Sequence, residues 1–494
     1  MTGLIHHAVA RQAALRPGAT AVIHGSARIG YGSLDAAARA HAARLAQLGV
    51  GPGHIVPVVL PRGIRLLTAL LAVLHTGAAY CALDHRWPPA HLASLAGRLG
   101  APLVVTDEPA GWPVPAWTLP DDPGPVPDAA PAAAPPGAGD APATVFFTSG
   151  TTGRPKAVVS PHRAALRLFG APTFADFGPG HAMPQAAPVP WDAFTLEVWG
   201  MLTTGGTCVV PEDDHLLPDD LRDLAERCGV DQLWLTSSLF NLFVDEDPDA
   251  FGGLRRVITG GERLSPEHVA RFLDRHPDIA LVNGYGPVES CVFATTHTVS
   301  RVDCALPDGI PLGRPVRGTG VLVLDGDEPV PPGTIGEICL TGAGLALGYF
   351  GEDPASANFT THRQDGRSVP LYRTGDLGVL DPDGVLHYRG RADRQVKIAG
   401  HRVEPAEIEA TTRGLPGVRD CAVLPLTGDD GGFDRLALFY TARPGAAPPE
   451  AVRTALAARL PRHLVPAVIT PLPSLPRTPQ GKLDRRALLS ATGG

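Results

Sequence analysis

The segment VFFTSGTTGRPKAVVSPH, residues 145–162, contains an apolar strand that runs directly into a loop of threonine, serine and glycine followed by Lys156. Gly150 and Gly153 let the backbone turn its N–H groups inward, and the loop hydroxyl groups add further hydrogen-bond donors. Because Lys156 adds a positive charge, the segment is suited to holding phosphate. The candidate phosphate-binding residues are Thr148, Ser149, Gly150, Thr151, Thr152, Gly153 and Lys156.

This segment differs from the common nucleotide-binding loop, in which Gly-Lys precedes Ser or Thr. Here Pro155 precedes the lysine and Ala157 follows it. Read alone, the segment is also compatible with a polar turn between two strands. The rest of the sequence therefore has to decide between a phosphate site and a turn.

The composition is that of an ordinary globular protein with several domains or subdomains. Its 494 residues are 44% hydrophobic and 19% charged, which is enough to bury large cores. The formal net charge of -8 disfavours nucleic acid or anionic lipid as a partner. The seven cysteines are scattered without a C-x-x-C pair, which argues against zinc sites and disulfide frameworks. With no secretory signal visible, we expect a cytoplasmic protein.

The first hundred residues alternate between predicted helices and strands, which indicates parallel sheets covered by helices. Residues 66–83 are mostly apolar, but polar residues interrupt them, so we expect a buried helix followed by a strand rather than a membrane span. Residues 108–142 are rich in proline and alanine and are expected to form a long surface excursion. The expected helices are residues 4–15, 31–48 (with a cap at 31–34) and 62–75, and the expected strands are residues 20–23, 56–60, 79–83 and 103–106.

Alternation resumes after the phosphate loop. Ligands bind at the carboxyl ends of parallel strands, so the ends of the next strands are expected to line one crevice. These expected strands are residues 206–210, 233–236, 257–259 and 280–283.

The pattern changes from Ile335 onward to short strands with Gly and Asp turns, which indicates a smaller β-rich unit. Its expected strands are residues 336–340, 377–380 and 385–389. We place a hinge near Asp393. The predicted fold is α/β, with a large N-terminal domain (residues 1–391) of several subdomains and a smaller, mobile α+β C-terminal domain (residues 392–494).

Nine segments occur in an order and spacing that is typical of one protein family. They are LHTGAAYCALD (74–84), TSGTTGRPKAVV (148–159), WDAFTLE (191–197), NGYGPVE (283–289), GEICLTGAGLALGYF (336–350), YRTGDL (372–377), GRADRQVKIAGHRVEPAEIE (390–409), LPRHLVP (460–466) and TPQGKLDR (478–485). Together they resemble the acyl-adenylate-forming (AMP-binding) superfamily, and specifically the amino-acid adenylation domains of nonribosomal peptide synthetases. The resemblance covers essentially the whole chain.

The resemblance implies an acid–thiol ligase that uses ATP and Mg²⁺. A substrate carboxylate attacks the α-phosphorus of ATP, which gives an acyl-adenylate and pyrophosphate, and the acyl group is then transferred to a thiol. By matching position, Glu289 would hold Mg²⁺ as a hard oxygen ligand. Asn283 and Tyr285 would contact adenine, Asp376 would accept the ribose hydroxyl groups, and Arg391 would approach the ribose.

Three further residues match functional positions in the hinge and the mobile C-terminal domain of such enzymes. Lys482 matches the lysine that bridges the substrate carboxylate and phosphate, although by itself it could be a solvated lysine in a terminal loop. Asp393 matches the hinge residue, and Lys397 matches the lysine that faces the site during thiol transfer. The chain departs from the family pattern at Ala157, Val288 and Leu347.

The resemblance also assigns a substrate pocket. Asp192 matches the aspartate that binds the α-amino group, and its alternative role is that of a helix cap. The other matched positions are Ala193, Leu196, Trp234, Ile258, Gly260, Gly284, Val292 and Phe293. None of these eight side chains is charged, so a small aliphatic substrate is expected. Trp234 and Phe293 take up volume in the pocket while Gly260 and Gly284 give volume back, a combination that is similar to valine pockets of the family. Isoleucine, leucine or 2-aminobutyrate could also enter, because one methylene is worth only about 1–3 kcal/mol.

Two other classes remain open from the sequence. The first is a neighbouring enzyme, either an acyl-CoA ligase or a D-alanine–carrier protein ligase. The second is a catalytically silent homologue that binds a nucleotide. Because nine residues follow Arg485, the sequence leads us to expect a stand-alone enzyme that loads the phosphopantetheine thiol of a separate carrier protein.

Overall fold

The computed structural model describes residues 3–120, 137–148, 155–171, 173–352, 358–364, 366–393, 395–398, 400–428, 433–442, 448–476 and 483–490. The chain forms two compact units. The first comprises residues 1–85, 96–146 and 157–392, and the second comprises residues 86–95, 147–156 and 393–494. Along the chain, the last boundary falls between Ala392 and Asp393.

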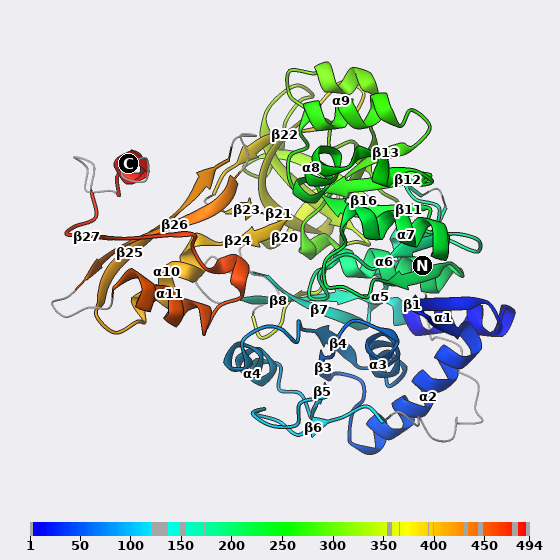
Figure 1. Ribbon diagram of the computed structural model, residues 1–494. Coiled ribbons are helices and arrows are strands. Elements are labelled where there is room, and N and C mark those ends of the chain that lie inside the picture. Colours follow the sequence, from blue (N-terminus) through cyan, green and yellow to red (C-terminus); the bar gives the residue numbers. More distant parts are fainter. Residues whose placement is uncertain are drawn as a thin grey trace. The chain divides into compact units, whose positions relative to one another are not determined.

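A seven-stranded sheet contains the strand that leads into the phosphate loop (Figure 1). Its spatial order is β19 (Gly348–Tyr349), β8 (Lys156–Pro161), β7 (Pro142–Thr148), β4 (Ala79–Ala82), β3 (Ile55–Val59), β5 (Val104–Thr106) and β6 (Ala116–Trp117). Pairing from β7 through β4, β3 and β5 to β6 is parallel, and β19 pairs with β8 antiparallel. Helices α3 (Ile64–His75) and α4 (Pro89–Arg98) connect its strands, and α2 (Tyr31–Gln47) precedes β3.

A four-stranded sheet shares one hydrophobic core with the seven-stranded sheet. Its order is β2 (Ala27–Gly30), β1 (Thr20–His24), β10 (Thr207–Val210) and β9 (Ala182–Pro184). The helices of this part of the chain are α1 (Ile5–Leu15), α5 (His162–Leu166) and α6 (Ala193–Thr204). Helix α6 is buried along nearly its whole length, which its apolar sequence AFTLEVWGMLTT predicts.

The third sheet presents its two faces to different hydrophobic cores. It contains β11 (Gln232–Thr236), β12 (Arg256–Gly260), β13 (Ala280–Tyr285), β14 (Thr295–Thr298) and β15 (Arg314–Pro315), of which the first three are parallel. Leu233, Val257 and Leu281 pack in one core with residues of helices α7 (Pro218–Cys228), α8 (Ser237–Glu246) and α9 (Pro266–Arg275). Trp234 and Ile258 pack in the other core, because successive side chains of a strand point to opposite faces.

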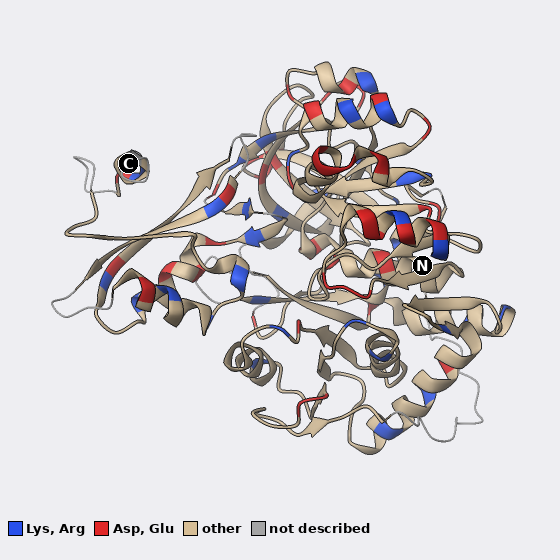
Figure 2. Cartoon of the chain, in the orientation of Figure 1, with Lys and Arg blue, Asp and Glu red and all other residues tan. Residues whose placement is uncertain are grey.

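Helices α7 and α9 carry charges of both signs on their exposed surface (Figure 2). On α7, Arg222 pairs with Asp219 at 3.3 Å and Arg227 pairs with Asp223 at 2.8 Å. Such exposed pairs at i,i+3 and i,i+4 spacing contribute little to stability and mark the solvent-facing side of a helix.

An antiparallel β-rich sheet follows. Its strands are β17 (Glu328–Pro329), β16 (Thr319–Asp325), β18 (Gly336–Gly342), β21 (Arg367–Leu380), β20 (Phe359–Gln364) and β22 (Leu386–Arg391). The unit begins at Thr319 and not at the predicted Ile335, and residues 377–380 are the end of the 14-residue strand β21 and not a short strand. Polar residues of β21, among them Thr374 and Asp376, interrupt the apolar pattern on which the prediction relied.

The second unit has its own core, which includes Val403, Ile408, Leu438 and Leu456. Strands β23 (Val396–Ile398) and β24 (His401–Val403) form a hairpin. Strands β25 (Val418–Thr427), β26 (Phe433–Ala442) and β27 (Val468–Leu472) form a sheet, and the helices are α10 (Pro405–Arg413), α11 (Pro449–Ala457) and α12 (Arg485–Ser490).

The predicted α/β class with parallel sheets and a smaller α+β C-terminal part is confirmed. One further local prediction is wrong. Helix α2 already begins at Tyr31 with Gly30 at the N-cap and no side-chain cap bond, so residues 31–34 are helix and not a cap. The predicted excursion also contains the short strand β6.

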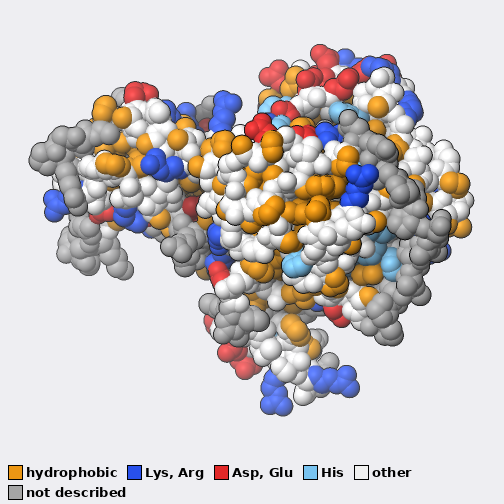
Figure 3. All heavy atoms as spheres, turned by 90° about the horizontal axis from the view of Figure 1, so that it is seen from below, with side chains coloured by type: hydrophobic (Ala, Val, Ile, Leu, Met, Phe, Trp, Pro, Cys, Tyr) orange, Lys and Arg blue, Asp and Glu red, His pale blue; other side chains and the backbone are white. Residues whose placement is uncertain are grey.

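Every helix among the described residues is too short or too polar to span a lipid bilayer. On the face of the molecule in Figure 3, apolar side chains are interspersed with charged and other polar groups. Large exposed apolar side chains such as Leu15 and Val302 belong to elements far apart in the sequence. Scattered exposure of this kind is normal for a folded protein.

Candidate functional site

The carboxyl ends of three parallel strands meet at the predicted substrate pocket. Thr236, Gly260 and Gly284 lie side by side in the register of β11, β12 and β13. A Cβ atom at Gly260 would lie 2.0 Å from the carbonyl oxygen of Gly284, and one at Gly284 would lie 2.3 Å from Cε1 of Phe293. The protein itself fills both spaces, so the expectation that these glycines leave open volume is wrong.

The apolar residues predicted for the pocket lie together in one buried core. These are Ala193, Leu196, Trp234, Ile258, Val292 and Phe293. The rings of Trp191 and Trp234 meet edge to face at a centroid distance of 6.5 Å, and those of Phe174 and Phe293 do so at 5.3 Å. This environment provides aliphatic and aromatic contacts for an apolar ligand group.

A strained backbone segment lies beside these residues. Cys291 and Val292 have φ angles of 50° and 62°, which non-glycine residues rarely adopt and which cost about 1–3 kcal/mol each. The N–H of Val292 donates to Oδ2 of Asp192 at 2.7 Å. Strain of this kind persists only where surrounding contacts hold it, and it is often found at functional sites.

Asp192 occupies the N-cap position of α6, but its side chain makes no cap hydrogen bond to the helix. Its carboxylate instead accepts the N–H of Val292, a residue 100 positions away in the sequence. This geometry does not support the alternative that Asp192 is simply a helix cap. It places a carboxylate next to the strained segment, and the role in binding an α-amino group stays a prediction.

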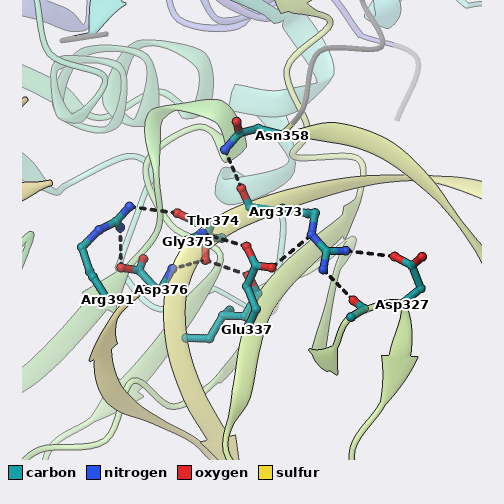
Figure 4. Close-up of polar contacts among 10 residues, drawn as sticks. Asp327, Glu337, Asn358, Arg373, Thr374, Gly375, Asp376 and Arg391 are labelled. Carbon is teal, nitrogen blue, oxygen red and sulfur yellow. Dashed lines mark hydrogen bonds and ion pairs between the residues drawn. The ribbon is translucent and has the colours of Figure 1, made fainter. Parts of the chain in front are cut away.

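A second group of predicted residues forms a hydrogen-bonded network on β13, β21 and β22. Figure 4 shows the part of it that joins Asp376 and Arg391. Asp376 accepts the hydroxyl of Tyr285 at 2.6 Å through Oδ2 and Nη1 of Arg391 at 2.5 Å through Oδ1. Asp376 and Arg391 are direct partners in the antiparallel register. Burial, reinforced by the negative charge of Asp376, raises the pKa of Tyr285 well above its ordinary value, so its hydroxyl stays a donor.

Neighbouring side chains hold the part of β21 that carries Asp376 (Figure 4). Oγ1 of Thr374 accepts the N–H of Asp376 at 3.0 Å and itself donates to the carbonyl of Ile338 at 2.7 Å. Glu337 accepts the N–H of Gly375 at 3.1 Å. Nε of Arg373 also donates to Glu337, at 3.0 Å. The sequence analysis did not single out Glu337 or Arg373, since each reads as a surface charge on a strand.

Two further residues predicted for the nucleotide site, Glu289 and Asn283, are buried. Glu289 is fully buried in a short 3-10 helix, and its Oε1 accepts the hydroxyl of Tyr349 at 2.9 Å. Val288 belongs to an apolar cluster with Val158 and Tyr349. Asn283 is buried on β13, and its Nδ2 donates to the carbonyl of Pro311 at 2.8 Å.

The structure describes only two of the seven predicted phosphate-binding residues, Thr148 and Lys156. Thr148 is buried at the end of β7, and Lys156 begins β8. In the second unit, Oδ1 of Asp393 accepts the N–H of Gln395 at 3.1 Å, and Lys397 pairs in register with Arg402 on the β23–β24 hairpin. The predicted residues Ser149, Gly150, Thr151, Thr152, Gly153 and Lys482 lie outside the described residues.

The sequence analysis missed two buried charged residues close to the pocket. Glu197 on α6 accepts the N–H groups of Ala186 at 3.1 Å and Ala187 at 3.0 Å, and burial raises its pKa to about 8. Arg167 is 1% exposed and donates to main-chain carbonyl groups beside the strained segment. The sequence signal that could have identified both residues is a single charged residue within an otherwise apolar stretch.

The comparisons with known proteins agree with this architecture. A profile of the AMP-binding enzyme family matches residues 9–350, and a profile of the AMP-binding enzyme C-terminal domain matches residues 407–482. The chain therefore belongs to the AMP-binding enzyme family, a family of adenylate-forming ligases.

Its curated relatives are nonribosomal peptide synthetases. Malpibaldin synthetase of Mortierella alpina is 36% identical over 98% of this chain, and tyrocidine synthase 3 of Brevibacillus parabrevis is 33% identical over 98% of it. The chain spans 9% and 7% of those two proteins. Holo-PA1221, an NRPS protein containing adenylation and PCP domains, is similar with a TM-score of 0.88 and 37% identity, covering 99% of this chain and 84% of that one. The resemblance to NRPS adenylation domains is confirmed.

Proposed function

We propose that the protein activates a small aliphatic amino acid, with valine favoured, as an aminoacyl-adenylate and transfers it to the phosphopantetheine thiol of a carrier protein. The observation that carries the proposal is the Asp192 carboxylate beside an otherwise apolar pocket. A half-buried anion at the pocket edge suits an α-ammonium group, and uncharged walls suit an aliphatic side chain. An acid without an amino group could not form this ion pair.

The adenylation step needs alignment more than acid–base chemistry. The substrate carboxylate is already ionised at neutral pH, and it attacks the α-phosphorus of ATP while the bond to pyrophosphate breaks. Because both reactants are anions, the rate depends on positioning and on donors that stabilise the developing charge. Lys156, Lys482 and the hydroxyl groups of the phosphate loop would supply these donors.

The nucleoside is assigned to the network around Asp376. Its carboxylate would accept the ribose hydroxyl groups, and Arg391 and Tyr285 hold it in place through the bonds at 2.5 and 2.6 Å. Asn283 and the ring of Tyr285 would contact adenine. Because these side chains bond to one another, the ribose site is organised before ligand binding, which lowers the entropic cost of binding.

Glu289 fits a magnesium ion that is held mainly by ATP. The described residues contain no cluster of three or more His, Cys, Asp or Glu side chains that could hold a metal on their own. Mg²⁺ commonly binds through one or two carboxylates together with substrate phosphates and water, so one buried carboxylate is a sufficient donor set. When bound, the ion would neutralise phosphate charge.

The close packing at Gly260 and Gly284 supports a small substrate side chain. Since the backbone and the Phe293 ring fill these spaces, the pocket is smaller than the glycines alone would suggest. Valine and 2-aminobutyrate are therefore favoured over leucine and isoleucine. Adding a methylene to a filled site costs about 1–3 kcal/mol.

The carrier protein is proposed as acceptor because the similar PA1221 contains adenylation and PCP domains. Thiol transfer would use Lys397, on the hairpin that follows Asp393. The thiol of phosphopantetheine attacks the acyl carbon, the bond to AMP breaks, and the thiol proton passes to solvent.

An ATP–pyrophosphate exchange assay over the proteinogenic amino acids, D-alanine and simple carboxylic acids tests the proposal. We expect exchange that depends on valine and is much weaker with the corresponding deaminated acid. Adding holo-carrier proteins should then give an aminoacyl mass shift. Efficient transfer to free coenzyme A instead would indicate an acyl-CoA ligase, a preference for D-alanine would indicate the D-alanine ligase, and absence of exchange with every acid would indicate a silent homologue.

A further inference from the structure

Arg167 is a buried cation next to the proposed pocket that has no role in the chemistry described above. It follows α5 and is 1% exposed. Nη2 donates to the carbonyl oxygens of Ser290 and Phe293, both at 2.7 Å. Nε donates to Oγ1 of Thr319 at 3.2 Å. A buried guanidinium is stable only when its donors are satisfied, and here the main chain supplies acceptors.

The two carbonyl groups held by Nη2 lie on either side of the strained residues. Ser290 precedes Cys291, and Phe293 follows Val292, so one nitrogen bridges the whole segment with positive φ angles. Nη1 also reaches the carbonyl of Cys291 at 3.4 Å. The guanidinium therefore contacts three of the four consecutive residues from 290 to 293.

Two functional features depend on this segment. The N–H of Val292 is directed at the Asp192 carboxylate, and the ring of Phe293 occupies the space next to Gly284. A relaxation of the segment would move both together. Burial lowers the pKa of Arg167 to about 10, so the side chain still carries its charge at neutral pH.

We propose that Arg167 is a positioning residue for amino-acid recognition, which holds residues 290–293 so that Asp192 and Phe293 keep the geometry of the substrate pocket. This inference rests on the proposed function, because it assigns the selectivity of the same site. The groups assigned to the nucleoside are bonded to one another through Asp376. Loss of Arg167 should therefore affect the amino acid more than ATP.

Glu289 has its own supports, although it is adjacent to Ser290. Its carboxylate accepts the hydroxyl of Tyr349, and its carbonyl accepts the N–H of Ala346 at 2.9 Å. These two bonds hold Glu289 independently of Arg167. The metal-binding position should thus survive a change at Arg167.

Gly344 offers a second way to disturb the guanidinium. A Cβ atom there would lie 2.4 Å from Nη2 of Arg167, and Gly344 is outside the left-handed backbone region. The substitution Gly344→Ala should therefore be tolerated by the backbone while it displaces the guanidinium. Arg163 on the preceding helix α5 is a matched control, because it also donates to main-chain carbonyl groups, those of Ala343 and Leu345, at 2.5 and 3.1 Å.

The test compares Arg167→Lys, Gly344→Ala and the control Arg163→Lys in ATP–pyrophosphate exchange. Lysine keeps the charge but loses the planar fork that bridges two carbonyl groups. We expect KM for valine to rise about tenfold or more for Arg167→Lys, the size expected when hydrogen bonds to a charged group are lost. KM for ATP should change less than about twofold, and the preference for valine over leucine should fall. Arg163→Lys should leave both KM values near those of the wild type.

The double variant separates this role from a general loss of stability. Gly344→Ala should raise KM for valine in the wild-type background and add little in the Arg167→Lys background, because both changes act on one contact. If Arg167→Lys does not fold, Gly344→Ala alone must still raise KM for valine selectively. Equal changes in both KM values, or unchanged KM for valine in folded variants, overturn the inference. A wild-type protein without amino-acid-dependent exchange overturns the proposed function instead.

Discussion

The pocket side and the nucleotide side of the site are built in different ways. On the nucleotide side, side chains in direct register on antiparallel strands bond to each other, as Asp376 does to Arg391. On the pocket side, a strained backbone segment is held by residues far away in the sequence, such as Asp192 at a separation of 100 residues. We therefore expect the proposed ATP site, whose side chains bond directly to one another, to tolerate changes better than the proposed amino-acid pocket, whose geometry depends on a strained main-chain segment.

The largest effect is expected for a residue that belongs to neither side. Lys482→Ala should lower the rate of adenylate formation by more than about a hundredfold, because loss of one charge at a developing anion costs about 3–4 kcal/mol by analogy with oxyanion donors. Exchange kinetics on the folded variant should show KM values for ATP and valine near those of the wild type. Near-normal turnover would contradict the role of Lys482.

Asp192→Ala tests the pocket side. Its charge-assisted bond to an α-ammonium group is worth about 1.5–3 kcal/mol, so kcat/KM for valine should fall about ten- to a hundredfold. Residual exchange with the deaminated acid, 3-methylbutanoate, should fall much less, and KM for ATP should stay unchanged. Equal losses for both acids would mean that Asp192 acts only through the Val292 N–H.

Tyr285→Phe tests the nucleotide side. It removes the donor at 2.6 Å from Asp376 but keeps the ring, and a bond to a charged acceptor is worth about 1.5 kcal/mol or more. We therefore expect KM for ATP to rise about tenfold with KM for valine unchanged. A rise of the same size in KM for valine would contradict the prediction that Tyr285 supports ATP binding only.

The last effect is a pH dependence of stability on the pocket side. The pKa of Glu197 is raised from 4.5 to about 8, so this carboxyl group holds its proton more tightly in the folded protein than in the unfolded chain. The contribution of Glu197 to the free energy of unfolding should then be greatest below pH 4.5 and be lost as the pH rises to about 8, by at most about 1.4 kcal/mol per pH unit.

Denaturant unfolding of Glu197→Gln at pH 5.5 and 7.5 measures this contribution. The amide keeps an oxygen acceptor for Ala187 but cannot ionise, so the stability of the wild type relative to Glu197→Gln should be greater at pH 5.5 than at pH 7.5. The exposed Glu226 on α7 provides the control Glu226→Gln, which should behave like the wild type. An unchanged pH dependence in Glu197→Gln would show that Glu197 does not bind the extra proton.

Local patterns in the sequence predicted most of the fold. Strands β11, β12 and β13 were located to within one or two residues, because apolar runs bounded by polar or glycine residues mark buried parallel strands. Strand β21 was mostly missed, since its site residues break the apolar pattern. The short β2 and β6 were also missed, because neither contains a run of apolar residues.

The candidate site was predicted unevenly. Motif order located Asp192, Glu289, Asp376 and Arg391, and the structure brings Asp376 and Arg391 into contact. The same motifs could not show that Gly284 makes room for Phe293, since an unoccupied and a filled position look alike in sequence. Glu197 and Arg167 were overlooked because their partners are main-chain groups, which leave no trace in residue type.

The sequence alone determined the family, the order of the elements and the types of residue at the site, because these depend on periodicity and spacing along the chain. The tertiary structure decided which of these residues meet. The Nη2 of Arg167 reaches Ser290 across 123 residues, and the positive φ angles of Cys291 and Val292 exist because such distant contacts hold them. Contacts of this range depend on how the sheets pack, and local sequence preference carries no information about them.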